Sequence, residues 1–342
     1  MITTEVEVNR TPAQTMIDLL TGFWVSRALY VAARLGLADL VGEQPVPVAE
    51  LAVRTGAHAD SLYRVMRALA GADIFEEHPG RRFSQTELSA MLRSDIPGSL
   101  RYTAISELGE DHYAAWEEIL YSVRTGRTAF CRRFGMQAWQ YYAENPDLGR
   151  VFERSMTGLT QRIHEAIVSA YPFLGFDRIL DVGGGEGSLL ARVLERNHLA
   201  SGILFDRPEV ISFAAGRLAQ SGAAGRILPV AGDFFEEVPA GADLHLLKWI
   251  IHDWNDEHAT RILRNCRASL EPGGRLLLIE TVIPESKQGL FPKLLDLNMM
   301  VMTGGRERTE DEFRRLLGRA GLRLARVIPT DSPVSLLEAE AA

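Results

Sequence analysis

The stretch RILDVGGGEGS, residues 178–188, decides the fold of the C-terminal half of this chain. Its first residues are typical of a short buried strand that ends at Asp181, and a helix can start at Ser188. Between them, residues 183–187 are nearly all glycine, which permits the tight turn that joins a strand to a helix. A strand, a glycine loop and a helix in this order indicate the first unit of a doubly wound sheet.

Apolar strands and amphipathic helices continue to alternate after this loop. We expect strands in SGILFD, RILPVAGD, ADLHLLKWIIHD and GGRLLLIET, which start at residues 201, 226, 242 and 273. Helices are expected over 188–196, 208–221, 255–270 and 309–320. This order predicts an α/β fold with a Rossmann-like, mostly parallel, doubly wound sheet, and ligands beyond the carboxyl ends of its strands.

The glycine loop predicts a particular kind of ligand. Gly183, Gly184, Gly185 and Gly187 do not have the GxGxxG spacing of a pyrophosphate-binding loop. Asp181, just before them, would repel a pyrophosphate and suits a ligand with an ammonium or sulfonium group. The alternative is a tight turn with no ligand at all.

Two further acids are expected beside this loop. Asp206 ends the second strand, where an acid accepts hydrogen bonds from ribose hydroxyls. Asp233 ends the third strand and can accept from an adenine amine, while Phe234 covers the face of the ring. Together with Asp181 they describe a pocket for an adenosine without phosphates and with a positive group near its tail. S-adenosylmethionine fits that description.

The N-terminal part is expected to be helical, with a winged helix. Residues 12–40 read as one or two helices with a wide apolar stripe, whose partner is either another chain or the protein's own core. Residues 46–95 have the order helix, turn, helix, with a wing at Pro79-Gly80. That segment holds six arginines and seven acids. A DNA-binding face should be clearly basic, so we favour a structural or dimerising role.

Residues 96–175 look helical and are rich in aromatic side chains. Eight of the 27 aromatic residues, Trp139 among them, fall between Tyr113 and Tyr142. They fill a core between helices, or several of them wall a pocket for a flat apolar ligand. Their density alone leaves both interpretations open.

Composition limits the class of protein. The 342 residues are 46% hydrophobic and 24% charged, with a net charge of −8, which argues against a dominant nucleic-acid or membrane surface. We see no apolar stretch that approaches the ~20 residues needed to cross a bilayer. The N-terminus lacks the regions of a secretory signal, and two cysteines exclude a disulfide framework. A cytoplasmic protein is expected.

Several segments resemble one known family, the class I small-molecule O-methyltransferases of the plant caffeic-acid and isoflavone type. Its bacterial relatives act on polyketides and phenazines. The similar segments are DVGGGEG, FDRPEV, GDFFEEVP, LKWIIHDWNDEHATRILRNCRASLEPGG and GGRERTEDEF, besides the helical and winged-helix N-terminal half. The block around HDW is the most specific. Glu186 stands where plant members usually carry threonine.

The resemblance implies the catalytic residues. It makes His252 the general base, which accepts the acceptor's hydroxyl proton during in-line methyl transfer, with Glu280 and Glu307 flanking and orienting the imidazole. An ordinary imidazole pKa near ~6.5 would leave most of it neutral at pH 7. The resemblance also places Lys248 and Trp249 at the cofactor pocket.

The sequence says less about which residues bind the substrate. By resemblance, Met156 and Met299 clamp the acceptor ring, although methionine equally fills ordinary cores. Asp296 either orients part of the site or is a buried structural acid. Trp139 is a further candidate substrate contact. No histidines have metal-ligand spacing such as HExxH, and we predict no metal.

These observations predict an S-adenosylmethionine-dependent O-methyltransferase that acts on a hydroxyl of an aromatic natural product. We expect a homodimer formed through the N-terminal helices. The expected divisions are a dimerisation domain over 1–100, a helical connector over 101–170 and a catalytic domain over 171–342. One alternative is an enzyme of the same fold that hydroxylates or decarboxylates such a substrate. The other is a non-catalytic winged-helix regulator that senses a metabolite.

Overall fold

The computed structural model describes residues 11–218 and 221–342. These residues form two compact units. The first runs to Glu110 and includes Arg150–Gly158, and the second comprises Asp111–Gly149 and Leu159–Ala342. The limits of these units do not coincide with the expected divisions at 100 and 170, which concern function and stay predictions.

The first unit contains the predicted winged helix. Its core is formed by buried residues of α1, α2, α3, α4 and the small sheet. That sheet has the order β1-β3-β2, with an antiparallel β2–β3 pair as the wing. The elements are α1 (Pro12–Leu35), α2 (Leu37–Leu40), β1 (Val46–Pro47), α3 (Val48–Thr55), α4 (Ala59–Ala70), β2 (Phe75–His78), β3 (Arg82–Gln85), α5 (Glu87–Ala90) and α6 (Arg101–Glu107).

Helix α1 corrects one expectation from the sequence. At 24 residues, this described helix is long and apolar enough to cross a membrane by length and composition alone. It was overlooked because Asp18 and Arg27 interrupt its apolar run. Thr11 caps its first turn through the N–H of Gln14. Several large side chains lie exposed on it, including Leu20 at 66% and Trp24 at 63%.

The second unit begins with the aromatic helices. These are α7 (Glu110–Glu117), α8 (Ile119–Thr125), α9 (Ala129–Phe134), α10 (Ala138–Glu144) and the second-unit part of α11 (Pro146–Ala170). The ring of Phe130 is fully buried and lies 4.6 Å from that of Phe134, which lies 4.6 Å from that of Tyr141. For these three rings, the core interpretation is the one that the structure supports.

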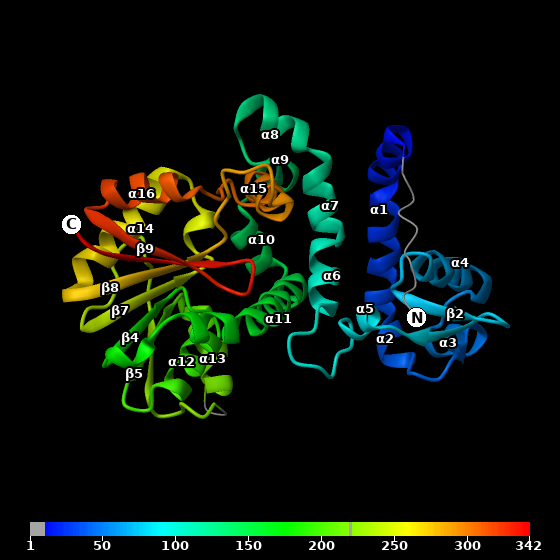
Figure 1. Ribbon diagram of the computed structural model, residues 1–342, viewed down its shortest axis with the longest axis horizontal. Coiled ribbons are helices and arrows are strands. Elements are labelled where there is room, and N and C mark those ends of the chain that lie inside the picture. Colours follow the sequence, from blue (N-terminus) through cyan, green and yellow to red (C-terminus); the bar gives the residue numbers. More distant parts are fainter. Residues whose placement is uncertain (1–10, 219–220) are drawn as a thin grey trace, which may run out of the picture. The chain divides into compact units, whose positions relative to one another are not determined.

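The rest of the second unit is a seven-stranded sheet with helices on both faces (Figure 1). Its order is β6-β5-β4-β7-β8-β10-β9, and the first five of these strands are parallel. This confirms the predicted mostly parallel, doubly wound fold. The elements are η1 (Phe173–Gly175), β4 (Arg178–Val182), α12 (Ser188–Arg196), β5 (Ser201–Asp206), α13 (Pro208–Leu218), β6 (Ile227–Ala231), β7 (Ala242–Lys248), η2 (Ile251–Asp253), α14 (Asp256–Ser269), β8 (Leu270–Glu280), α15 (Leu290–Met302), α16 (Glu310–Arg319), β9 (Leu322–Pro329) and β10 (Ser335–Ala341).

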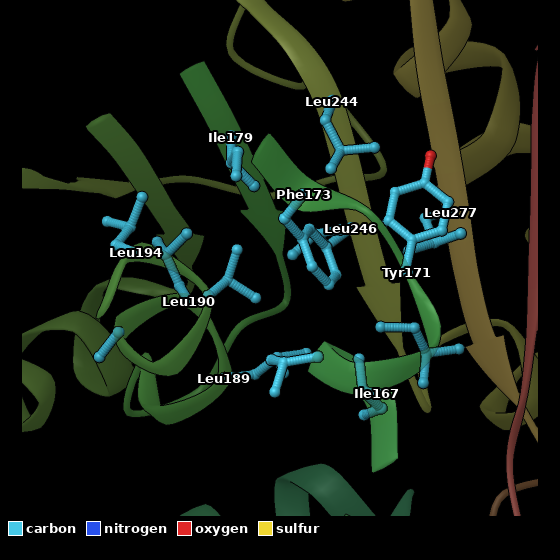
Figure 2. Packing of buried hydrophobic residues seen from close by; sticks show 14 of the residues in the cluster. Ile167, Tyr171, Phe173, Ile179, Leu189, Leu190, Leu194, Leu244, Leu246 and Leu277 are labelled. Atoms are coloured by element: carbon cyan, nitrogen blue, oxygen red, sulfur yellow. The ribbon is translucent and has the colours of Figure 1, made fainter. Parts of the chain in front are cut away.

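Neighbouring residues of each central strand point to opposite faces of the sheet, as the strand period requires. Ile179 packs with α11 and α12 on one face, whereas Leu180 packs with α14 and α16 on the other. Figure 2 shows the first of these cores, where Leu189 and Leu190 lie on the same side of the sheet as Leu246. Both faces are therefore covered, and the polar strand ends remain as the place for a site.

The antiparallel hairpin β9–β10 was not predicted. β10 pairs with β8 in an antiparallel direction and closes the sheet together with β9. The alternation of strands and helices, which predicts a last helix over 309–320, does not reveal a terminal hairpin.

Candidate active site

In the glycine loop after β4, the backbone conformation or the closeness of neighbouring atoms requires glycine at particular positions. Gly183 has φ +68°, and its N–H donates to the carbonyl of Phe205 at 2.8 Å. A Cβ on Gly184 would lie 2.6 Å from Cγ of Asp181. The N–H of Gly185 donates to Oδ2 of Asp206 at 2.8 Å. The loop therefore joins the two acids at the ends of β4 and β5.

Asp181 is an unsatisfied acid beneath this loop. Its side chain is buried, and Oδ2 has no hydrogen-bond partner among the described residues. Burial raises the pKa of Asp181 to about 7 despite the attraction of Lys248. A buried oxygen without a partner is costly, so this position fits a ligand that brings hydrogen-bond donors or positive charge.

Lys248 is the last residue of β7, which runs parallel to β4 and ends at the same edge of the sheet as the strand of Asp181. Its Nζ donates to Oγ1 of Thr160 at 2.9 Å and lies 4.7 Å from the centre of the Trp249 ring. Burial lowers the pKa of Lys248 to about 8, although Asp181 and Glu280 oppose the shift. Thr160 was not singled out from the sequence, because nothing in a helix pattern marks a hydroxyl that will meet a lysine.

Asp233 and Phe234 follow β6, as predicted. Asp233 is exposed, and its Oδ1 accepts from the N–H of Phe235 at 2.8 Å. Phe234 is half-buried and lies edge-on to Trp254, with 6.1 Å between ring centres. A Cβ on Gly183 would lie 3.7 Å from the Phe234 ring. The ring thus borders the glycine loop.

The chain bends sharply between β7 and His252. Trp249 has φ +53°, a left-handed conformation that is unusual for a bulky residue and is concentrated at functional sites. After this bend, the N–H groups of Ile250 and Ile251 both donate to Oε1 of Glu280, at 3.2 and 2.8 Å. Glu280 therefore holds the backbone of the turn that delivers His252.

His252 is buried among three carboxylates. Its Nδ1 donates to Oε1 of Glu307 at 2.7 Å and lies 4.0 Å from Oε2 of Glu280. On the other side of the ring, Nε2 lies 3.8 Å from Oδ1 of Asp253. The structure thus brings together the three predicted catalytic residues and adds Asp253, a neighbour that was not among the predicted site residues.

The expectation of an ordinary imidazole pKa is wrong for this environment. Burial alone would lower the pKa of His252, but the charges of Asp253, Glu307 and Glu280 outweigh it and raise the pKa to about 10. Burial also raises the pKa of Glu280 to about 7 and that of Asp253 to about 6. Ligand-free His252 is therefore charged at neutral pH, because the fold surrounds it with acids.

The loop carrying Glu307 is fastened from two sides. Oδ1 of Asp296, in α15, accepts from the N–H of Glu307 at 2.9 Å. The next residue, Arg308, has a guanidinium that is almost fully buried, with 1% of its side chain exposed. Nothing in the sequence marks Arg308 as a buried residue, because arginine is mostly exposed in folded proteins.

For the remaining predicted substrate contacts, the structure gives a position and a degree of burial but no contact that points to a substrate role. Met299 is buried in α15, and its carbonyl accepts from the N–H groups of Thr303 and Gly304. Trp139 is half-buried in α10. Met156 is half-buried in the part of α11 that belongs to the first unit. Their substrate roles stay predictions.

His252, Glu280 and Glu307 also form a group whose ligand-type atoms lie within 4.8 Å of one another, a spacing that could suit a metal ion. The hydrogen bond from His252 to Glu307 already accounts for this closeness. The absence of a metal requirement stays a prediction.

The sheet order and the glycine loop define a class I S-adenosylmethionine-dependent methyltransferase. The O-methyltransferase domain model matches residues 116–323, and the O-methyltransferase dimerisation domain model matches residues 17–95. The chain therefore belongs to the O-methyltransferase family and is an S-adenosylmethionine-dependent enzyme.

Relatives with known reactions match this chain over nearly its whole length. The chain is 45% identical to phenazine O-methyltransferase PhzM of Lysobacter antibioticus over 95% of each chain. It is 38% identical to a mitomycin biosynthesis 6-O-methyltransferase of Streptomyces lavendulae, over 95% of this chain and 93% of that one. The crystal structure of LaPhzM superposes with a TM-score of 0.92 at 44% identity and covers 97% of this chain and all of its own.

Two other relatives bear on the choice of reaction. The methyltransferase NcsB1 of neocarzinostatin biosynthesis, solved with S-adenosylmethionine and 2-hydroxy-5-methyl naphthoic acid, superposes with a TM-score of 0.82 at 32% identity over 98% of this chain and all of its own. Aclacinomycin 10-hydroxylase RdmB of Streptomyces purpurascens is 36% identical over 87% of this chain and 81% of its own. The family thus includes an enzyme named for hydroxylation.

Proposed function

We propose that the protein methylates a hydroxyl of an aromatic natural product of the phenazine, polyketide or phenolic type, with His252 as the general base. The observation that carries the proposal is a buried imidazole anchored on one nitrogen only. Its Nδ1 is held by Glu307, while Nε2 makes no hydrogen bond within the described part of the chain. An imidazole held in this way presents a defined second nitrogen to an acceptor.

Each acidic neighbour has a separate task in this proposal. Glu307 fixes the tautomer and the ring plane through Nδ1, and it stabilises the imidazolium after proton transfer. Glu280 holds the turn through two backbone N–H groups. Asp253 raises the basicity of His252 from the Nε2 side. Nε2 would then take the proton of the acceptor hydroxyl, so that the acceptor oxygen could bond to the methyl carbon in line with the bond from that carbon to the sulfonium sulfur, which would leave as a neutral thioether.

The raised pKa of His252 suits a phenolic acceptor. A phenol is a weak acid, with an ordinary pKa of about 10. The charges of Asp253, Glu307 and Glu280 raise the pKa of His252, so its neutral form binds the proton of such an acceptor more strongly than an ordinary imidazole does. The neutral imidazole is a minority form at neutral pH, so the proposal requires the rate to rise with pH.

The glycine loop and its acids fit the methyl donor. S-adenosylmethionine, when bound, supplies an electrophilic methyl group on a sulfonium. Asp181 offers a buried unpartnered oxygen to the positive end of the donor, and Lys248 and Trp249 border that part of the site. We assign Gly183, Gly184 and Gly185 to its close backbone contacts, Asp206 to ribose hydroxyls, and Asp233 and Phe234 to the adenine.

Met299, Trp139 and Met156 are proposed to contact the acceptor ring, whereas Asp296 acts through the backbone of Glu307. A bacterial relative acts on a phenazine, and another was solved with a naphthoic acid. Flat, fused aromatic acceptors are therefore the class to test first.

We propose that the enzyme is a cytoplasmic homodimer formed through the N-terminal helices. The dimerisation domain model begins at residue 17, inside α1, and α1 carries the exposed apolar side chains. This supports a protein partner for α1 in place of a membrane. We also propose that residues 1–100 form the dimerisation domain, that residues 101–170 form a helical connector that contributes to the acceptor pocket, and that residues 171–342 form the catalytic domain.

The mass of the product tests the proposed reaction. The protein is incubated with methyl-deuterated S-adenosylmethionine and a panel containing 1-hydroxyphenazine, 2-hydroxy-5-methyl naphthoic acid and their O-methyl ethers. We expect one labelled methyl group on a free phenol and none on an ether. A gain of one oxygen or a loss of carbon dioxide would instead identify the alternative chemistry on this fold.

The regulator alternative has a separate test. A gel-shift titration at low salt should show no sequence-dependent retention of DNA, because the winged-helix segment has no net positive charge. Strong retention would favour the regulator.

A further inference from the structure

We infer that Arg308 is a positioning residue that holds His252 and Glu307 within hydrogen-bonding distance of each other. This inference rests on the proposed role of His252 as the base. Arg308 directly follows Glu307 in the chain, and its side chain is nearly fully buried. Burying a cation costs free energy unless its N–H donors have hydrogen-bond partners. The partners of this guanidinium therefore identify the segments that it connects.

The guanidinium contacts the backbone on both sides of His252. Its NH1 donates to the carbonyl of Ile251 at 3.1 Å, and its NH2 donates to the carbonyl of Trp254 at 2.9 Å. NH1 also donates to the carbonyl of Arg306 at 3.2 Å, on the near side of Glu307. One planar group therefore bridges the turn that carries the base and the loop that carries its carboxylate partner.

The guanidinium is itself anchored by Asp256, in the first turn of α14. Nε and NH2 of Arg308 donate to Oδ1 of Asp256 at 3.1 and 2.9 Å. The other oxygen, Oδ2, binds the exposed Arg319 at 3.2 Å. The orientation of Arg308 is thus fixed from a third element, independently of the two that it joins.

The two bridged segments also touch directly. The N–H of Arg306 donates to the carbonyl of His252 at 2.8 Å, and a Cβ on Gly305 would lie only 2.0 Å from that oxygen. The segments are therefore in close contact at the backbone, and the guanidinium of Arg308 adds side-chain hydrogen bonds to carbonyls of both segments. A lysine lacks the planar fork that serves these carbonyls and the carboxylate together.

A double-mutant cycle separates positioning from a general structural role. Arg308→Lys should lower kcat by ~10²-fold, the loss expected for a misplacement of about 1 Å. In the Glu307→Gln background the same change should cost no more than ~2-fold, since the ion pair that Arg308 positions is already lost. Turnover is measured with the fastest phenol of the product-mass panel. Equal losses in both backgrounds would overturn the inference.

Control measurements keep the outcomes distinct. Arg319→Gln removes only the exposed partner of Asp256 and should leave kcat within ~2-fold of wild type; a loss as large as that of Arg308→Lys would overturn the inference. Donor affinity by calorimetry should be unchanged in Arg308→Lys. If Arg308→Lys fails to bind the donor, the double-mutant cycle with Glu307→Gln is repeated with Asp256→Asn in its place. We expect the same pattern of losses in kcat, and equal losses in both backgrounds would again overturn the inference. His252→Ala is run in parallel, and full activity there would refute the proposed function itself.

Discussion

Nδ1 of His252 lies 2.7 Å from Oε1 of Glu307, although 55 positions separate these residues in the chain. One follows β7 and the other precedes α16, and the sheet brings both to the edge where parallel strands end. This contact decides which ring nitrogen is anchored. It leaves Nε2, beside Asp253, as the nitrogen that can face an acceptor.

The first prediction concerns pH. The pKa of His252 is raised to about 10, so the neutral base becomes more abundant as the pH rises towards that value. The logarithm of kcat/KM should therefore increase through the neutral range and level off in the alkaline range. Asp253→Asn removes one of the charges that raise this pKa and should shift the rise to lower pH. A flat profile from neutral to alkaline pH, with no shift in the variant, would contradict the protonated resting state.

The second prediction separates the two glutamates. Glu280→Ala leaves the N–H groups of Ile250 and Ile251 without their acceptor and should lower the free energy of unfolding by about 2–4 kcal/mol. Glu280→Gln keeps an acceptor oxygen and should cost less. Urea unfolding followed by circular dichroism measures both, with Glu307→Gln as the comparison. Equal stability of the alanine and glutamine variants would show that Glu280 does not hold the turn.

The third prediction concerns the exposed face of α1. Leu20→Arg places a charge on this face and should convert a dimer into monomers, as measured by light scattering after gel filtration. Leu199→Arg is the matched control, because Leu199 lies in the second unit and is 96% exposed. That variant should stay dimeric. A wild-type protein that is monomeric at micromolar concentration would refute the dimer.

The fourth prediction is that no metal is needed. Nδ1 of His252 is engaged by Glu307, and a protonated imidazole repels a cation. Treatment with EDTA followed by dialysis should leave turnover unchanged. Lost activity that zinc or magnesium restores would instead assign the group of His252, Glu280 and Glu307 to a metal.

Much of the fold could be predicted because it depends on local patterns. The glycine loop, the strand ending at Asp206 and the helix–turn–helix before Pro79 are all visible as residue types at short spacing. The hairpin β9–β10 was missed because its pairing with β8 is a long-range choice.

The site was predicted in composition but not in electrostatics. His252, Glu280 and Glu307 were identified by resemblance, and the structure brings them together. The raised pKa of His252 depends on how many acids the fold buries around it, which a sequence does not state. The contacts of Arg308 could not be predicted either. They are made to backbone carbonyls, which every residue has, so no residue type in the sequence marks them.

The most direct test of the central claim is the rate of methyl transfer by His252→Ala, measured together with its affinity for S-adenosylmethionine. Loss of a general base should lower turnover by ~10²–10⁴-fold while donor affinity stays at the wild-type value, because the glycine loop and Asp206 are untouched. Turnover close to wild type, or a parallel loss of donor binding, would contradict the role of His252 as the base.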